Sequence, residues 1–158
     1  MTEVEYSMQF PQYEENMRKA VCLAKEAAQN DEIPVGCVIV RGDEVIAACA
    51  NAMRKSGFTG HHAEIIALEE AVRKTGAHSL DDCTLYTTLE PCGMCSGAIA
   101  HYRVGQVVFG AYDKEYGCMF SKLCLPRIMG QEVKCIGGVL EEECTDLLNT
   151  YFKQLRSS

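Results

Sequence analysis

The sequence lacks the features that mark membrane proteins, secreted proteins and proteins with a basic surface. None of its apolar runs has the length of a transmembrane helix. The segment Met1–Gln12 is polar and acidic, without the basic and apolar regions of a secretory signal, so we expect no signal peptide. Basic residues are a minority, since 15 Lys and Arg against 22 Asp and Glu give a net charge of −7. This balance argues against a generally basic surface for nucleic acid and allows only a local basic patch.

Repeats, low-complexity tracts and linkers are also absent, so we expect a single domain over residues 1–158. The ten cysteines would suggest disulfides in a short secreted chain. Several of them, such as Cys37 and Cys49, instead replace ordinary core residues in apolar runs. This usage favours buried free thiols in a reducing, cytoplasmic environment. Cys118 and Cys124 fall in a segment predicted to be irregular, where a thiol can be reactive.

Hydrophobic periodicity predicts helices and strands that alternate after an opening hairpin. Strands are expected over residues 35–40, 44–50, 84–88, 106–110 and 132–136, and helices over 14–29, 63–74, 93–102 and 140–155. Gly42-Asp43 supplies the hairpin turn, Gly76 ends the second helix, and residues 111–130 are expected to be irregular. The alternation predicts a mixed sheet between layers of helices.

Two short segments carry the residue types of a catalytic zinc site. His62-Ala63-Glu64 and Pro91–Cys95 together offer three ligands of the kind that zinc takes, namely His62, Cys92 and Cys95. Three protein ligands leave one tetrahedral position open, which distinguishes a catalytic zinc from a structural one. A helix N-terminus favours thiolate over thiol, and each segment opens a predicted helix. We therefore expect strand, tight loop and helix start at both segments, with one zinc ion per chain between two helix N-termini.

Glu64 lies two residues beyond a ligand and is assigned to proton transfer. Hydrolytic deamination replaces an exocyclic amino group on an aromatic ring with oxygen, and water is too weak a nucleophile for this at neutral pH. Zinc lowers the pKa of a bound water to about 7. A carboxylate beside the metal can then move protons from the water to a ring nitrogen and to the departing amine. Pro91 suits the start of the following helix, because its φ is fixed and it has no N–H.

Two other interpretations of these segments stay open at this stage. A C-x-x-C pair in a chain with ten cysteines could be a redox pair or a coincidence. A structural zinc site would need a fourth Cys or His at short spacing, and His61 is the one close candidate. Adjacent residues point in different directions, so His61 and His62 fit a single ion poorly.

H-x-E followed by P-C-x-x-C is the signature of zinc-dependent nucleobase deaminases, and the chain resembles the cytidine deaminase-like superfamily. More narrowly, it resembles the bacterial tRNA-specific adenosine deaminases, and the resemblance covers nearly the whole chain. The segments that carry it are Ile33–Gly36, Asn51, His62–Glu64, Leu85–Cys95, Val107–Ala111 and Tyr151-Phe152.

The resemblance implies a three-layer α/β/α fold with a central five-stranded mixed sheet. It also implies a homodimer with active sites near the interface, and conversion of the wobble adenosine of tRNA to inosine. Asn51 would contact the substrate base or ribose, and we group Pro91 with it as a substrate-binding residue. Without the resemblance, a turn residue at the end of a strand is the favoured interpretation of Asn51.

Other functions remain possible for the same motif. One is a deaminase of a free nucleobase or nucleoside, such as guanine, cytosine or a related ring. Another is a catalytically silent subunit that binds RNA or a partner, although the intact Glu64 argues against it. In the tRNA interpretation Tyr151 and Phe152 would support or line the mouth of the pocket. The residues that could contact phosphates are Arg54, Lys55, Lys122, Arg127, Lys153 and Arg156. Ordinary solubilising surface is the preferred interpretation of these residues until a basic patch is seen. Convergence of Arg127, Lys153 and Arg156 on one face near the pocket would distinguish a tRNA substrate from a free nucleobase or nucleoside.

Overall fold

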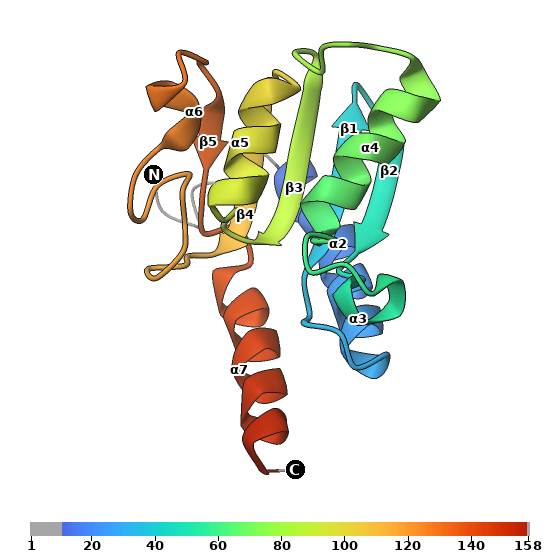
Figure 1. Ribbon diagram of the computed structural model, residues 1–158, viewed down its shortest axis with the longest axis vertical. Coiled ribbons are helices and arrows are strands. Elements are labelled where there is room, and N and C mark those ends of the chain that lie inside the picture. The colour runs from blue at the N-terminus through green and yellow to red at the C-terminus, as the bar shows by residue number, and fades with distance from the viewer. Residues whose placement is uncertain (1–10, 158) are drawn as a thin grey trace.

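The computed structural model describes residues 11–157, which form one five-stranded sheet with helices on both faces (Figure 1). Most of the segment Met1–Gln12, and the two ends of the expected 1–158 domain, lie outside the described residues. Among the residues that are described, no helix combines the length and the apolar character needed to cross a membrane.

The sheet is mixed, as predicted, and its strands run in the order β2-β1-β3-β4-β5. They are β1 (Gly36–Arg41), β2 (Glu44–Ala50), β3 (Cys83–Leu89), β4 (Gln106–Ala111) and β5 (Lys134–Ile136). Strand β1 pairs antiparallel with β2 and β3, whereas β3, β4 and β5 are parallel. Gly42 adopts a positive φ of 60° in the β1–β2 turn, so the predicted hairpin is confirmed.

Helices cover the two faces of the sheet and enclose two apolar cores. On one face lie α4 (Ala63–Thr75) and α5 (Gly93–His101), and on the other lie α2 (Pro11–Gln29) and α7 (Glu141–Ser157) (Figure 1). Alternate residues of each strand point into opposite cores, as Cys37 and Val38 of β1 do. The predicted three-layer α/β/α architecture is therefore confirmed.

The predicted elements match the observed ones to within a few residues, with three differences. Two short helices were not predicted, α3 (Met53–Ser56) and α6 (Leu125–Ile128), and the latter lies in the segment expected to be irregular. The last strand is shorter than expected. Gly76 ends α4 in the left-handed conformation, with its N–H donating to the Val72 carbonyl at 2.8 Å, as predicted.

The two motif segments meet at one edge of the sheet, where the parallel strands β3 and β4 end. Leu89 pairs with Ala111 at the carboxyl ends of these parallel strands. Beyond β3 the chain turns directly into α5, and the start of α4 lies beside the start of α5 at the same edge (Figure 1). Both predicted ligand segments therefore meet where the strands end.

Candidate active site

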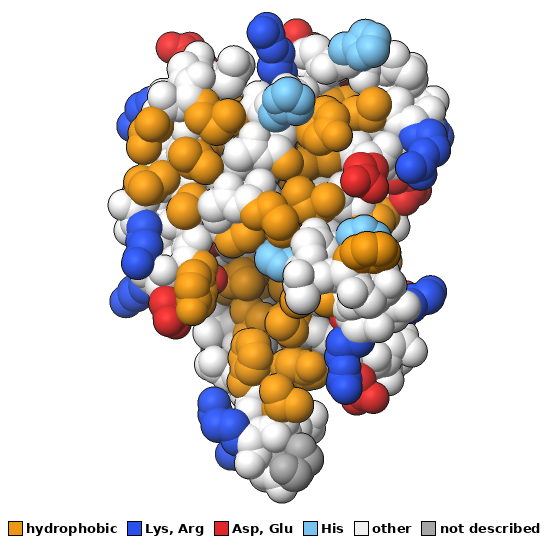
Figure 2. All heavy atoms as spheres, in the orientation of Figure 1, with side chains coloured by type: hydrophobic (Ala, Val, Ile, Leu, Met, Phe, Trp, Pro, Cys, Tyr) orange, Lys and Arg blue, Asp and Glu red, His pale blue; other side chains and the backbone are white. Residues whose placement is uncertain are grey.

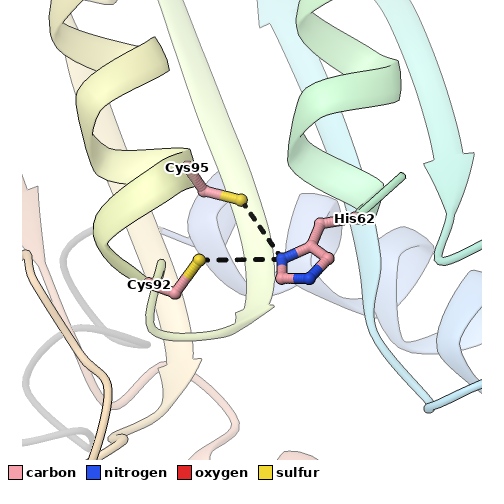
Figure 3. A group of neighbouring side chains, drawn as sticks. All are labelled: His62, Cys92 and Cys95. Carbon is pink, nitrogen blue, oxygen red and sulfur yellow. Dashed lines mark hydrogen bonds between the residues drawn. The ribbon is translucent and has the colours of Figure 1, made fainter. Parts of the chain in front are cut away.

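The three predicted ligands form a compact cluster between two helix N-termini (Figure 3). His62 Nδ1 lies 3.6 Å from Cys92 Sγ and 3.5 Å from Cys95 Sγ. All three donor atoms lie within 4.8 Å of one another. His62 and Cys92 occupy the N-cap positions of α4 and α5, and neither side chain caps its own helix. Both side chains are therefore available as ligands.

The geometry of the cluster suits a zinc ion. Tetrahedral zinc with Zn–S near 2.3 Å and Zn–N near 2.0 Å sets sulfur and nitrogen about 3.6 Å apart. The two observed sulfur–nitrogen distances, 3.5 and 3.6 Å, agree with this spacing. Among the described residues, no fourth His, Cys, Asp or Glu belongs to the cluster. The chemistry and spacing of the donors are thus those of a zinc site with one open position.

The two thiols of the cluster differ in acidity. The hydrogen bond with Cys95, aided by that with His62, lowers the pKa of Cys92 to about 4 against the opposing effect of burial. The hydrogen bond with Cys92, followed by burial, raises the pKa of Cys95. A thiolate thus forms readily at Cys92, whereas Cys95 needs a nearby cation to lose its proton. Metal ions bind thiolates with release of protons, so a bound zinc ion would supply that cation.

Glu64 points into the same site from the first turn of α4. Its side chain is buried, and its Oε1 accepts a hydrogen bond from Thr87 Oγ1 at 2.7 Å. Cys95 Sγ lies 3.5 Å from Glu64 Oε2. Burial raises the pKa of Glu64, with the Thr87 hydrogen bond opposing the rise. A carboxyl group whose pKa is raised above its usual value is suited to exchange protons in both directions.

The loop before His62 differs from the prediction. A tight loop was expected between strand and helix start at both motif segments. It occurs before Cys92, but residues 51–62 separate β2 from α4 and include α3. Within this segment the Ala52 N–H donates to the His61 carbonyl at 3.1 Å. The chain therefore closes back on itself and delivers His62 beside the end of β3.

A cavity of about 800 Å³ opens beside the cluster. Its wall includes His62, Glu64 and Cys92 together with apolar side chains such as Leu89 and Phe152. Figure 2 shows a hydrophobic hollow that continues downward onto α7. A mostly apolar cavity with a few convergent polar groups is the usual form of a small-molecule or base pocket.

The two residues predicted to bind substrate occupy different positions. Asn51 is buried and lines the cavity, and its Nδ2 donates to Glu32 Oε2 at 3.2 Å. Pro91 is buried behind the cavity wall, where its carbonyl accepts hydrogen bonds from Cys118 N–H at 2.9 Å and from Ser96 Oγ at 3.2 Å. Asn51 can therefore reach a bound molecule, whereas Pro91 supports the wall from behind.

Glu32 and Glu90 are two functional side chains that sequence reasoning missed. Glu32 is buried, and besides holding Asn51 it accepts the Lys55 N–H at 2.8 Å, which ties α3 to the turn before β1. Glu90 is 1% exposed and anchors residues 112–124, here called the rim loop. Only the buried positions of these two carboxylates distinguish them from surface acids, and burial is not visible in the residues themselves.

Glu90 accepts hydrogen bonds from two parts of the rim loop, residue 113 and residues 119–121. Its Oε2 accepts the N–H groups of Phe120 at 3.0 Å and Ser121 at 2.8 Å. Its Oε1 accepts the N–H of Asp113 at 3.1 Å and the hydroxyl of Ser121. Burial acts to raise the pKa of Glu90, yet these hydrogen bonds hold it below its usual value. The ionised carboxylate thus fixes the rim loop against the end of β3.

The candidate phosphate contacts do not all gather at the cavity. Lys122 lines the cavity wall, whereas Arg127 lines a separate cavity with Arg103 and Lys134. Tyr151 donates its hydroxyl to the Asp31 carbonyl at 3.4 Å and lies outside the cavity wall, but Phe152 lines it as expected. The convergence of Arg127, Lys153 and Arg156 near the cavity, which would favour a tRNA substrate, is therefore not found. Basic side chains do flank the hydrophobic hollow, over the rim loop, α3 and the end of α7 (Figure 2).

Sequence comparison places these features in a known family. The cytidine and deoxycytidylate deaminase zinc-binding region matches residues 11–111, which contain all of His62, Glu64, Cys92 and Cys95. The chain is 39% identical over 142 residues to the tRNA-specific adenosine deaminase of Bacillus subtilis, and the match covers 89% of this chain and 88% of that protein.

Solved structures agree with this placement. A tRNA:A34 deaminase, which performs A-to-I editing at the wobble position of transfer RNA, superposes with a TM-score of 0.77 at 31% identity, over 84% of this chain and 97% of that one. Guanine deaminase from Bacillus subtilis is 40% identical with a TM-score of 0.59, but over 61% of this chain and 62% of that one. The chain belongs to the cytidine and deoxycytidylate deaminase family and is a zinc-dependent hydrolytic deaminase.

Proposed function

We propose that the protein converts the wobble adenosine of a tRNA to inosine and releases ammonia. The observation that carries this proposal is the 39% identity to a tRNA-specific adenosine deaminase along nearly the full length of both chains. Fold alone would not choose a substrate, because guanine deaminases share it.

Each side chain of the site has a role in this reaction. His62, Cys92 and Cys95 would hold the zinc ion, which would act as a Lewis acid and make water nucleophilic at neutral pH. Glu64 accepts the two protons of the attacking water in turn, and it delivers the first to the ring nitrogen and the second to the amine, which leaves as ammonia. Thr87 keeps the Glu64 carboxylate oriented through its 2.7 Å hydrogen bond. Asn51, held in turn by Glu32, contacts the base or its ribose.

A free purine base is the second candidate substrate. The 40% identity to guanine deaminase favours it, although that likeness extends over only 61% of this chain. The cavity of about 800 Å³ is in the range of pockets that hold drug-sized ligands, and its open hydrophobic mouth suits a base that remains attached to its strand. A base in an anticodon loop is unpaired, so placing it in the pocket requires little unstacking energy.

We further propose that the chain forms a homodimer and acts in the cytoplasm. Within residues 11–157, which include all ten cysteines, no disulfide forms, which suits a reducing compartment. Several large apolar side chains are exposed away from the cavity wall, which suits a protein interface.

The test is inosine formation in a 17-nucleotide anticodon stem-loop with adenosine at the wobble position. Ammonia release from guanine, cytosine and their nucleosides is measured in parallel, with Glu64→Ala as the inactive control. We expect inosine with the wild-type enzyme and little turnover of the free compounds. Rapid turnover of a free base without inosine would transfer the assignment to the second candidate.

A further inference from the structure

The rim loop presents two aromatic side chains to solvent beside the active-site cavity. Tyr116 is 64% exposed and Phe120 is 70% exposed, and Tyr116 also lines the cavity wall. A single exposed ring needs no explanation, but two rings within five residues, one in the wall of the catalytic cavity and the other packed edge-on against the wall residue Tyr112, indicate a contact surface. The hydrophobic hollow of Figure 2 is continuous with this region.

These two rings are held in place by a fixed backbone. Glu90 accepts the Phe120 N–H at 3.0 Å, and the Asp113 carboxylate accepts the Tyr116 N–H at 3.0 Å. The Cys118 N–H between them donates to the Pro91 carbonyl at 2.9 Å, next to the metal cluster. Because the loop is fixed on both sides of residue 118, each ring projects from an ordered position. A preorganised surface loses little conformational entropy when it binds.

Phe120 is also anchored through its ring. Phe109, buried in the core, meets Tyr112 edge-on with ring centroids 4.9 Å apart, and Tyr112 meets Phe120 edge-on at 5.7 Å. Aromatic pairs in this geometry are mutually stabilising. The series connects the core of the protein to an exposed ring at the rim, so the position of Phe120 is set by packing.

The charges of the rim loop favour contacts through its aromatic rings over contacts to phosphates. The loop carries Lys114 and Lys122 against Asp113 and Glu115, so its own charge is balanced. A balanced loop on a chain of net charge −7 has little attraction for phosphates. Stacking of bases on aromatic rings does not depend on net charge and tolerates any base sequence.

We propose that Tyr116 and Phe120 form a stacking subsite for the unpaired bases that flank the target nucleotide. The ligand of this subsite is a single-stranded RNA segment, and base stacking gives it a contact that the charge-balanced rim loop does not offer to phosphates. The proposal rests on the proposed function, because it requires a substrate with neighbouring bases.

The experiment pairs protein variants with altered stem-loops. Tyr116→Ala and Phe120→Ala remove a ring, and Tyr116→Phe and Phe120→Tyr are the matched variants that keep one. The RNA is the wobble-adenosine stem-loop, intact or with an abasic residue immediately 5′ or 3′ of the target. The readout is kcat/KM for inosine formation, with zinc content and thermal unfolding measured for every variant.

On the intact stem-loop, each alanine variant should lose about 5-fold or more in kcat/KM, whereas the ring-keeping variants should stay near wild type. On the abasic RNA that lacks the stacked base, the kcat/KM of the wild type should fall to that of the alanine variant. The kcat/KM of the alanine variant should be the same on this RNA as on the intact stem-loop. Alanine variants that match wild type on the intact RNA would overturn the subsite alone. The subsite would also be overturned if an alanine variant lost the same factor in kcat/KM, relative to wild type, on all three RNAs. A wild-type enzyme that makes no inosine would overturn the proposed function and the subsite with it.

Discussion

Glu64 is the residue on which the proposed proton transfer depends. It is buried, it hydrogen-bonds to Thr87, and its carboxylate stands beside the cysteines without belonging to the ligand cluster. We therefore expect Glu64→Ala to lower kcat by a factor of about 10² to 10⁴ while the zinc content stays near one ion per chain. Inosine assays combined with metal analysis by mass spectrometry check both parts. Substantial residual activity, or loss of the metal, would rule out the proton-transfer role.

The metal ligands can be distinguished from a neighbouring thiol. Cys92→Ala and Cys95→Ala each remove one of three ligands, so both variants should lose zinc on dialysis. Cys118→Ala is the matched control, because Cys118 lines the same cavity and is not part of the cluster. It should keep a full zinc content. If both ligand variants also kept their zinc, the ligand assignment would be wrong.

Residues of the site differ in how far the sequence predicts them. The sequence alone identifies the three metal ligands His62, Cys92 and Cys95. Their side chains are typical zinc ligands, and their spacing fits a known zinc site. Glu32 and Glu90 cannot, because each acts on segments distant in sequence. Glu32 holds Asn51 across 19 residues, and Glu90 holds Ser121 across 31. Only the tertiary structure shows that these carboxylates are buried and accept hydrogen bonds from distant segments.

At the scale of elements, α4 shows how packing overrides hydrophobicity. The sequence pattern predicts Ile65, Ile66, Leu68 and Val72 on the buried side. In the structure Leu68 is buried, but its buried companions are alanines and Glu64. Ile66 and Val72 pack against the core while partly exposed, and Ile65 is partly exposed. Small residues let a helix approach the sheet closely. The close approach in turn places Glu64 against Thr87 of β3, which no residue-by-residue preference indicates.

The rim loop is an element whose order depends on one carboxylate. In Glu90→Gln an amide N–H₂ replaces one acceptor oxygen, so loop N–H groups that bonded to the carboxylate lose a partner. Hydrogen bonds to a charged group contribute about 1.5–3 kcal/mol each, so we expect a loss of unfolding free energy of about that size. Hydrogen–deuterium exchange should become faster for residues 113–121, and denaturant titration gives the change in stability.

Glu69→Gln is the control for this loop prediction, because Glu69 is exposed on α4. It should leave both measurements at the wild-type level. Unchanged exchange of residues 113–121 in Glu90→Gln would show that other contacts hold the loop.

At the scale of the whole molecule, the exposed apolar surface bears on assembly. Outside the cavity wall, the large hydrophobic side chains that are exposed include Phe58, Met94, Leu123, Ile128 and Met129. Figure 2 shows hydrophobic atoms over α5 and α6 on the face that also holds the cavity. Soluble monomers rarely expose contiguous apolar surface of this kind without a partner. The sequence pattern places apolar residues in α5 and cannot tell which of them another chain covers.

A homodimer through this face gives the final prediction. Light scattering at micromolar concentration should give a mass of about 35 kDa, twice the 17.4 kDa chain. A twofold interface presents the same patch twice, so one substitution places two charges in it. Met94→Glu on α5 should therefore shift the mass toward that of a monomer. Lys25→Glu, an exposed change on α2 in the opposite helix layer, should leave the dimer intact. A wild-type monomer at this concentration would refute the dimer, and a dimer unaffected by Met94→Glu would place its interface elsewhere.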